Sequence, residues 1–356
     1  MRTKGSPRGW SGSCWGTRPN PPLTALPVIH ATATAKAVAA FVAAHYALDG
    51  PAACSFVNRG FNDTYAIRDA GGAEFVLRLS SPRARGPADV AAETAFIAYL
   101  DGADVPVAAP VPARTGALFT AAPLPGGPRP AVLFHIAKGR RPDLDGPEDA
   151  AAQGRTLARL HDAADHYPAR AAGQCRLDLD HLLHRPAAAV MALDHDAPAA
   201  RRDFMALAAR LEAAVLRVDA ALTRTRCHGD THGLNARIAT AGRYAGQAVF
   251  FDFDDGGWGY LAYDLAVHLW AQVSFGRRRQ VMWHAFRAAY GAERPVTPAD
   301  EAALPVFVAV RHIWLMGEFA AQTALWGTET LSAAWLAREI AFLLAWERDM
   351  LGPALL

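Results

Sequence analysis

The spacing of hydrophobic and polar positions divides the chain into two parts of different character. A helical repeat begins at Thr34, with apolar side chains on one face, and ends at Asp49 and Gly50. Three short runs with the two-residue period of β-strands follow, and two more lie beyond a helical repeat at 90–100. These runs are CSFVN (54–58), TYAIR (64–68), EFVLRL (74–79), GALFT (116–120) and AVLFHIA (131–137). Their order predicts an antiparallel sheet of five strands with one helix inserted after the third.

Beyond residue 137 the pattern becomes mostly helical. A connector of turn-forming residues, 138–149, leads into helical repeats at 154–165 and 201–222, and from Asp264 onward we expect only helices. Two strand-like runs alone interrupt this part, and a turn at Ala241 and Gly242 between them predicts a hairpin. These two runs are NARIAT (235–240) and QAVFFDF (247–253).

Together the two patterns predict an α+β protein of two lobes. The N-terminal lobe, residues 29–137, contains the small antiparallel sheet, and the C-terminal lobe, residues 138–356, is larger and mostly helical. Residues 1–28 carry four basic residues and no acidic one, and they lack the apolar stretch of a signal peptide. We predict that this segment is a disordered tail.

Composition narrows the choice of partners. Apolar residues make up 52% of the 356 positions, enough for a substantial core, and the net charge of +2 favours neither a nucleic acid nor a membrane surface as partner. No apolar run reaches the roughly 18 residues of a membrane span. The four cysteines are far apart and form no C-x-x-C pair, which is typical of free thiols in the reducing cytoplasm. The sequence carries no signal for the oligomeric state.

The stretch CHGDTHGLN, residues 227–235, gives the first chemical signal. Asp230 and Asn235 are spaced as in the catalytic loops of kinases, where the aspartate orients the attacking hydroxyl and the asparagine oxygen binds Mg²⁺. Asp252 ends the apolar strand one hairpin later, where a second hard oxygen ligand for Mg²⁺ is needed. The three residues therefore predict phosphoryl transfer from ATP with Mg²⁺.

The predicted sheet supplies matching features for binding phosphates. Gly60 and Asn62 lie in NRGFNDTY, between the first two strands, where a tight turn lets backbone N–H groups approach phosphate oxygens. A basic residue on the third strand should also reach the phosphates, and Arg78 is the only one inside that strand. Glu93, on the helix that follows, is its predicted partner, because arginine and carboxylate pair through two hydrogen bonds.

Four segments, in order, resemble the aminoglycoside phosphotransferase family, which includes choline kinase and homoserine kinase-like enzymes and has the protein-kinase-like fold. They are GFNDTY (60–65), FVLRL (75–79), HGDTHGLN (228–235) and FFDFDDGGWGYLAYDLA (250–266). The resemblance covers roughly residues 35–350. It implies a nucleotide-binding N-terminal lobe, a catalytic C-terminal lobe, and ATP between them with adenine against residues 134–140.

The resemblance also implies a role for each of five residues. Asp230 would be the catalytic aspartate, Asn235 and Asp252 the Mg²⁺ ligands, His228 a support for the loop, and Asp264 the group that holds the loop backbone. Two positions depart from the family pattern. Arg78 stands where lysine is usual, and Phe253-Asp254 follows Asp252 in place of Phe-Gly, so we expect no kinase-type flip of this segment. Asp254 is either a turn residue or a second metal ligand.

The predicted activity is an ATP- and Mg²⁺-dependent transfer of phosphate to a hydroxyl of a small molecule, such as an amino alcohol, a homoserine-like compound or an aminoglycoside. One alternative is a serine/threonine protein kinase of the stress-response type, which would act on a protein. A metal-dependent hydrolase is another, because His228, Asp230 and His232 form an H-x-D-x-H pattern. The last alternative is a nucleotide-binding module without catalytic turnover.

The acceptor site is expected in the C-terminal helices. Six tryptophans lie between Trp270 and Trp346, and core packing is their main predicted role, with a pocket for an organic cation as the alternative. The stretch RHIWLMGEF, residues 311–319, mixes charged groups with these aromatic residues. We expect substrate contacts there first.

Overall fold

A computed structural model describes residues 30–81, 86–168, 175–194, 197–277 and 279–351 of the chain. The predicted tail, residues 1–28, lies outside the described residues. Five antiparallel strands form the predicted sheet, in the spatial order β1-β2-β3-β5-β4. Their bounds are Ala53–Arg59 (β1), Asp63–Arg68 (β2), Glu74–Leu79 (β3), Thr120–Ala122 (β4) and Arg129–His135 (β5).

The alternation of side chains on β3 gives the sheet two different faces. Phe75, Leu77 and Leu79 are buried in a core that includes Val38 and Val42 of helix α1, Ala35–His45. Arg78 points to the other face, as the period of a strand requires. The α1 helix begins where predicted, because the hydroxyl of Thr34 accepts a hydrogen bond from the N–H of Ala37.

The fourth strand begins later than the sequence predicted. Residues 116–119 of the GALFT run are not part of a strand, and β4 contains only Thr120–Ala122. The backbone of Gly116 has a φ of 84°, and its N–H bonds to the carbonyl of Ala113. This turn uses the residues that the pattern assigned to the strand.

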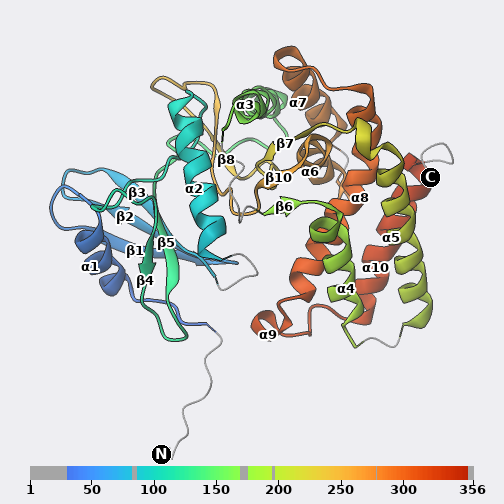
Figure 1. The fold of residues 1–356 in the computed structure, drawn as a ribbon, viewed down its shortest axis with the longest axis horizontal. Helices are drawn as coiled ribbons and strands as arrows, with labels where there is room; N and C mark the ends of the chain where they lie inside the picture. Colours follow the sequence, from blue (N-terminus) through green and yellow to red (C-terminus); the bar gives the residue numbers. More distant parts are fainter. Residues whose placement is uncertain (1–29, 82–85, 169–174, 195–196, 278, 352–356) are drawn as a thin grey trace, which may run out of the picture.

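Helix α2, Pro87–Gly102, lies on the side of the sheet that faces the helical part of the molecule (Figure 1). Its apolar residues Phe96, Ile97 and Leu100 belong to the large core of the helical part and not to the α1 core. Two hydrogen bonds reinforce this packing: Arg226 donates to the carbonyl of Ala92 at 2.9 Å, and the Tyr99 hydroxyl donates to the carbonyl of Ala163 at 3.2 Å.

The helical part is built around α8, Pro298–Ala320, which packs against α4, α5 and α6. By length and composition α8 is the one helix among the described residues that qualifies as a membrane span, although the sequence predicted no such run. However, 72% of its apolar window is buried inside the protein, as in a core helix. The other helices are α3 Pro147–Asp165, α4 Arg185–Met191, α5 Pro198–Val218, α6 Leu261–Val273, α7 Gln280–Glu293, α9 Thr323–Trp326 and α10 Ala333–Trp346, with π-helical turns at Asp180–His184 and Glu347–Leu351.

The predicted hairpin is present as β8, Ala236–Ile238, and β9, Ala248–Phe250. The prediction that it alone interrupts the helices was wrong. A second sheet of three strands, in the order β6-β10-β7, lies beside it. Its strands, β6 Arg176–Leu177, β7 Arg224–Cys227 and β10 Gly257–Tyr260, have two to four residues each, too few to show a period of two. Because β7 ends at Cys227, this sheet positions the segment that follows it.

Candidate active site

The segment 228–235 connects β7 to β8 and requires glycine at its second position. Gly229 has a φ of 85°, which L side chains rarely adopt. A Cβ atom there would lie 2.1 Å from the carbonyl oxygen of Asp255, so the loop packs directly against backbone at the start of β10. The close approach brings Asp230 and the 252–255 segment to the same side of the molecule.

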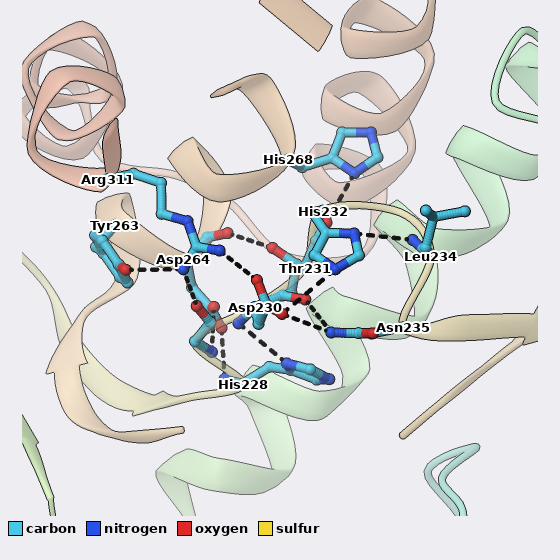
Figure 2. Close-up of polar contacts among 11 residues, drawn as sticks. His228, Asp230, Thr231, His232, Leu234, Asn235, Tyr263, Asp264, His268 and Arg311 are labelled. Carbon is cyan, nitrogen blue, oxygen red and sulfur yellow. Dashed lines mark hydrogen bonds and ion pairs between the residues drawn. The ribbon is translucent and has the colours of Figure 1, made fainter. Parts of the chain in front are cut away.

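Asp264, in the first turn of α6, holds the backbone of this loop (Figure 2). Its carboxylate accepts hydrogen bonds from the N–H groups of His228, at 2.7 Å, and Gly229, at 2.8 Å. His161 of α3 lies 3.0 Å from the same carboxylate. Complete burial would raise the pKa of Asp264, but these hydrogen bonds outweigh it and lower the pKa. The carboxylate is thus a fixed anion in the protein interior.

His228 is fully buried, and both of its ring nitrogens are engaged by the backbone. Nδ1 accepts a hydrogen bond from the N–H of Asp230, at 3.2 Å, so Nε2 carries the proton and donates to the carbonyl of Phe251, at 3.1 Å. Burial lowers the pKa of this imidazole and keeps it neutral. Neither nitrogen is available to a metal ion, which counts against the H-x-D-x-H hydrolase. Within the described residues no group of three or more His, Cys, Asp or Glu side chains converges as a metal site.

Asp230 receives hydrogen-bond donors on both carboxylate oxygens (Figure 2). Arg311 donates to Oδ1 at 2.5 Å and Asn235 donates to Oδ2 at 2.7 Å, while Nε2 of His232 lies 3.4 Å from Oδ2. Desolvation would raise the pKa of Asp230, but Arg311 and then His232 outweigh it and hold this pKa well below its usual range. The carboxylate is therefore ionised and fixed in orientation.

Sequence reasoning did not identify Arg311 as the partner of Asp230. Arg311 lies on α8, 81 positions away, and its guanidinium also stacks over Trp314, at 4.3 Å, and Trp270, at 5.3 Å. The prediction named residues 311–319 only as a region of substrate contacts. The available signal in the sequence was Arg311 itself, a single arginine in the mostly apolar stretch 302–317. In the structure this residue is 3% exposed.

The oxygens expected to hold Mg²⁺ are present in a suitable form. The carboxylate of Asp230 only accepts hydrogen bonds, so the amide nitrogen of Asn235 must face it, and the amide oxygen remains as a ligand. Asp252 follows β9 with a φ of 67°, an unusual conformation for a residue other than glycine. Two causes raise the pKa of Asp252: desolvation is the larger, and repulsion from the carboxylate of Asp254 is the second. These two oxygens, one from an amide and one from a carboxylate, are suitable ligands for a divalent cation.

The predicted pair of Arg78 and Glu93 is observed. The guanidinium nitrogens of Arg78 donate to both carboxylate oxygens of Glu93, at 2.8 and 2.6 Å, and both side chains are buried. Nη1 of Arg78 also lies 3.9 Å from Oδ1 of Asp252. The pair therefore connects β3, α2 and the predicted metal ligand.

The turn between β1 and β2 approaches the same place. Asn62 donates to Asp254 at 2.7 Å and accepts from the N–H of Ser81 at 3.0 Å, so it bridges the sheet and the helical part. A Cβ atom at Gly60 would meet no atom within 4 Å, so the space beside this residue is open on the protein side. Asp254, which the sequence leaves as a turn residue or a second metal ligand, accepts this hydrogen bond through Oδ2.

These residues enclose one cavity of about 450 Å³ between the sheet and the helices. The residues from the sheet include Gly60, Asn62 and Arg78, and those from the helical part include Asp230 and Asp252. Glu93, Asn235, His228 and Asp264 do not line this cavity. Glu93 bonds to Arg78 and Asn235 bonds to Asp230, and both of these partners do line it. The cavity thus brings together five residues that the sequence predicted for the site. Other lining residues come from α6, α8 and the loop after α6, and they include Trp270, Gln272, Phe275, Arg277, Arg279, Arg311 and Trp314.

Comparison with known sequences identifies relatives along most of the chain. The model of the phosphotransferase enzyme family matches residues 54–299. An uncharacterized protein of Deinococcus radiodurans is 40% identical over 331 residues, which cover 90% of this chain and 92% of that protein. Residues 54–299 include the sheet except for Ala53, the segment 228–235 and the cavity residues as far as Arg279, whereas Arg311 and Trp314 lie beyond them.

Two solved structures have the same fold. An amicoumacin kinase in complex with AMP-PNP, Ca²⁺ and Ami is 20% identical, and the match covers 89% of this chain and 95% of that one with a TM-score of 0.69. A microcompartment-associated aminopropanol kinase is 24% identical, with 87% and 95% covered and a TM-score of 0.66. Both alignments extend over the sheet and the helical part together.

Proposed function

The chain belongs to the phosphotransferase enzyme family, and from that premise we propose that it transfers the γ-phosphate of ATP to a hydroxyl group of a small molecule, with Mg²⁺ as the metal. The observation that carries the proposal is the state of Asp230. Arg311 and His232 hold this carboxylate ionised, and Asn235 fixes its orientation. In a cavity that also contains Arg78 and Asp252, it is suited to orient an acceptor hydroxyl beside bound phosphates.

In the proposed reaction the acceptor oxygen forms a bond to the γ-phosphorus while the bond from that phosphorus to the bridging oxygen of ADP breaks. Asp230 accepts the hydrogen bond of the hydroxyl and fixes the line of attack. The hydroxyl proton becomes strongly acidic only as the new P–O bond forms, so a carboxylate of low pKa suffices to take it and release it to water. Catalysis then depends mainly on positioning and on neutralising charge.

Other residues of the cavity would bind the metal ion and the phosphates. Asn235 and Asp252 would hold Mg²⁺, which supplies neutralisation of the phosphate charge when bound. Arg78, oriented by Glu93, would contact phosphate oxygens, and the backbone at Gly60 would cover them.

A nucleotide-dependent melting experiment tests the first half of the proposal. A ligand that binds only the native state stabilises it by about 2.7 kcal/mol at a hundred times its dissociation constant. We expect Mg·ATP to raise the melting temperature and ATP with a chelator to raise it much less. No shift at millimolar Mg·ATP would contradict the proposal.

Labelled ATP and a panel of hydroxyl compounds test the second half. We expect a labelled small-molecule product with the native chain and almost none with Asp230→Asn. A mixture of serine- and threonine-containing peptides in the same assay tests the protein-kinase alternative, which predicts label in the peptides instead.

A further inference from the structure

The aromatic wall of the cavity already holds a cation that belongs to the protein. The guanidinium of Arg311 lies 4.3 Å from the ring centre of Trp314 and 5.3 Å from that of Trp270. These are the two rings that would otherwise attract an organic cation through their faces. The guanidinium already occupies the faces of these two rings, so the alternative of a tryptophan pocket for organic cations does not fit at Trp270 and Trp314.

The same wall presents hydrogen-bond donors that lack acceptors. Nε of Arg311 and Nε1 of Trp314 are buried and have no hydrogen-bond partner, and both residues line the cavity. Buried polar groups are almost always hydrogen-bonded in native proteins. Oε1 of Gln272, an acceptor on a residue that lines the same cavity, is likewise buried without a partner. The unpaired groups at this wall are thus two donors and one acceptor, which indicates a ligand that brings mainly acceptor oxygens.

Two further arginines line the cavity from the loop between α6 and α7. Arg277 donates to the carbonyl of Ala271, at 3.1 Å, and has no acidic partner among the described residues. Arg279 forms an ion pair with the exposed Asp145, at 2.7 Å. Phe275 in the same loop has a φ of 55° and is 56% exposed, which is an unfavourable conformation and environment for an aromatic residue without a binding role.

The acidic residues of the cavity are engaged elsewhere. Asp230 is paired with Arg311, Asp254 accepts from Asn62, and Asp252 is the predicted metal ligand near Arg78. Asp255, the fourth, is buried. The end of the cavity formed by α6, α8 and their loop therefore offers cationic donors and aromatic surface, with no uncommitted carboxylate.

We propose that the acceptor is a hydroxyl compound that also carries an anionic oxygen group, either a carboxylate or a phosphate ester. The anionic group binds at Arg277 and Arg279 and accepts from the donors of Arg311 and Trp314, while the hydroxyl lies at Asp230. This inference rests on the proposed phosphotransferase function. It assigns a substrate class opposite in charge to amino alcohols and aminoglycosides. Of the acceptors expected from the sequence, only the homoserine-like compound carries a carboxylate.

The test starts from a bacterial small-molecule extract separated by ion exchange into anionic, cationic and neutral fractions. Each fraction is incubated with the enzyme, Mg²⁺ and ATP labelled on the γ-phosphate, and labelled products are separated from ATP. We expect the label in the anionic fraction. Treating that fraction with phosphatase before the assay separates the two sources of charge, because only a phosphate ester is lost.

The variant Arg277→Gln connects the product to the site. One charge-assisted hydrogen bond is worth about 1.5–3 kcal/mol, so we expect the apparent KM for the active anionic fraction to rise roughly ten- to a hundredfold, with the KM for ATP unchanged. Arg243→Gln is the matched control, because Arg243 pairs with Asp101 and Asp104 at the surface and does not line the cavity.

The possible results are distinct. Label in the cationic or neutral fraction, or an Arg277→Gln enzyme with unchanged kinetics, would overturn the anionic acceptor and leave the phosphotransferase proposal standing. Label in no fraction, although Mg·ATP shifts the melting temperature, would overturn the phosphotransferase proposal and this inference with it.

Discussion

At the scale of single residues, the central feature is a partly buried carboxylate whose charge is balanced before any substrate arrives. Asp230 and Arg311 form an ion pair in which the side chains are 16% and 3% exposed. Removing one partner of such a pair leaves the other charge without compensation, and this costs about 3–5 kcal/mol. The pair should therefore contribute to both stability and turnover.

The first prediction concerns this pair. Arg311→Gln should lower the free energy of unfolding by about 3–5 kcal/mol, because Asp230 is then left without its cationic partner. The double variant with Asp230→Asn should lose less than the sum of the two single variants, since both changes remove the same interaction. Denaturant unfolding of the four proteins measures the coupling. Additive losses would mean that the two residues do not act as a pair.

The second prediction separates two carboxylates of the same cavity. Asp230→Asn should lower kcat by at least about a hundredfold and leave the affinity for Mg·ATP nearly intact, because Asp230 addresses the acceptor. Asp252→Asn should weaken the binding of Mg·ATP as well, because it removes a metal ligand. Isothermal titration with Mg²⁺ and a non-hydrolysable ATP analogue measures the nucleotide affinity of both variants, and steady-state kinetics measure kcat. Equal loss of nucleotide binding in the two variants would contradict this division.

The sequence identified the residues that occur in short motifs and missed the partner that does not. Asp230 and Asn235 are five positions apart, and the pairing of Arg78 with Glu93 followed from one strand and the next helix. Arg311 reaches Asp230 from α8, which packs against α6, and no local spacing records that contact. Asp252 was predicted as a ligand, but its left-handed backbone was not.

At the scale of secondary structure elements, strands that overlap a strand-like run of five or more residues were predictable, and strands without such a run were not. The five strands of the first sheet and the hairpin β8–β9 were found from their alternation. The strands β6, β7 and β10 were missed, because their pairing depends on partners distant in sequence, such as Gly257 opposite Cys227. These missed strands carry and flank the catalytic segment, so the motif was located correctly without its structural support.

The third prediction concerns the connection between β3 and α2. Arg78→Ala should raise the KM for ATP and lower kcat together, and Glu93→Ala should do the same more weakly, because Glu93 acts by orienting Arg78. Arg78→Lys should retain partial activity, since lysine keeps the charge but not the planar pair of donors. Steady-state kinetics in ATP decide the question. Unchanged kinetics in Arg78→Ala would point to another phosphate contact, with Arg59 the next candidate.

At the scale of the whole molecule, buried neutral histidines make stability depend on pH. His268 stacks on Phe286 with 3.9 Å between ring centres, its Nδ1 lies 3.2 Å from the carbonyl of Thr231, and its Nε2 lies 3.4 Å from the amide nitrogen of Gln272. Burial lowers the pKa of His268 to about 4. The imidazole is therefore neutral in the folded protein and gains a proton more readily when the chain unfolds.

The fourth prediction follows from this difference. The folded pKa of His268 lies below the unfolded value of about 6.5, so its contribution to stability is complete above that pH and is lost as the pH falls toward 4. The slope from this one group approaches about 1.4 kcal/mol per pH unit. His268→Gln should flatten the pH dependence of the unfolding free energy in this window, whatever its effect at pH 8. The exposed His166→Gln is the control and should leave the slope unchanged.

The packing of α2 has a consequence for how the activity can be controlled. Many kinases are switched off by swinging the equivalent helix outward, which separates its glutamate from the phosphate-binding residue. Here the backbone of α2 is bonded to Arg226 on the strand that leads into the catalytic segment, and its apolar face is part of the helical core. An outward swing would have to open that core. We therefore expect an enzyme without an off state of this kind, whose output in the cell follows the supply of its two substrates.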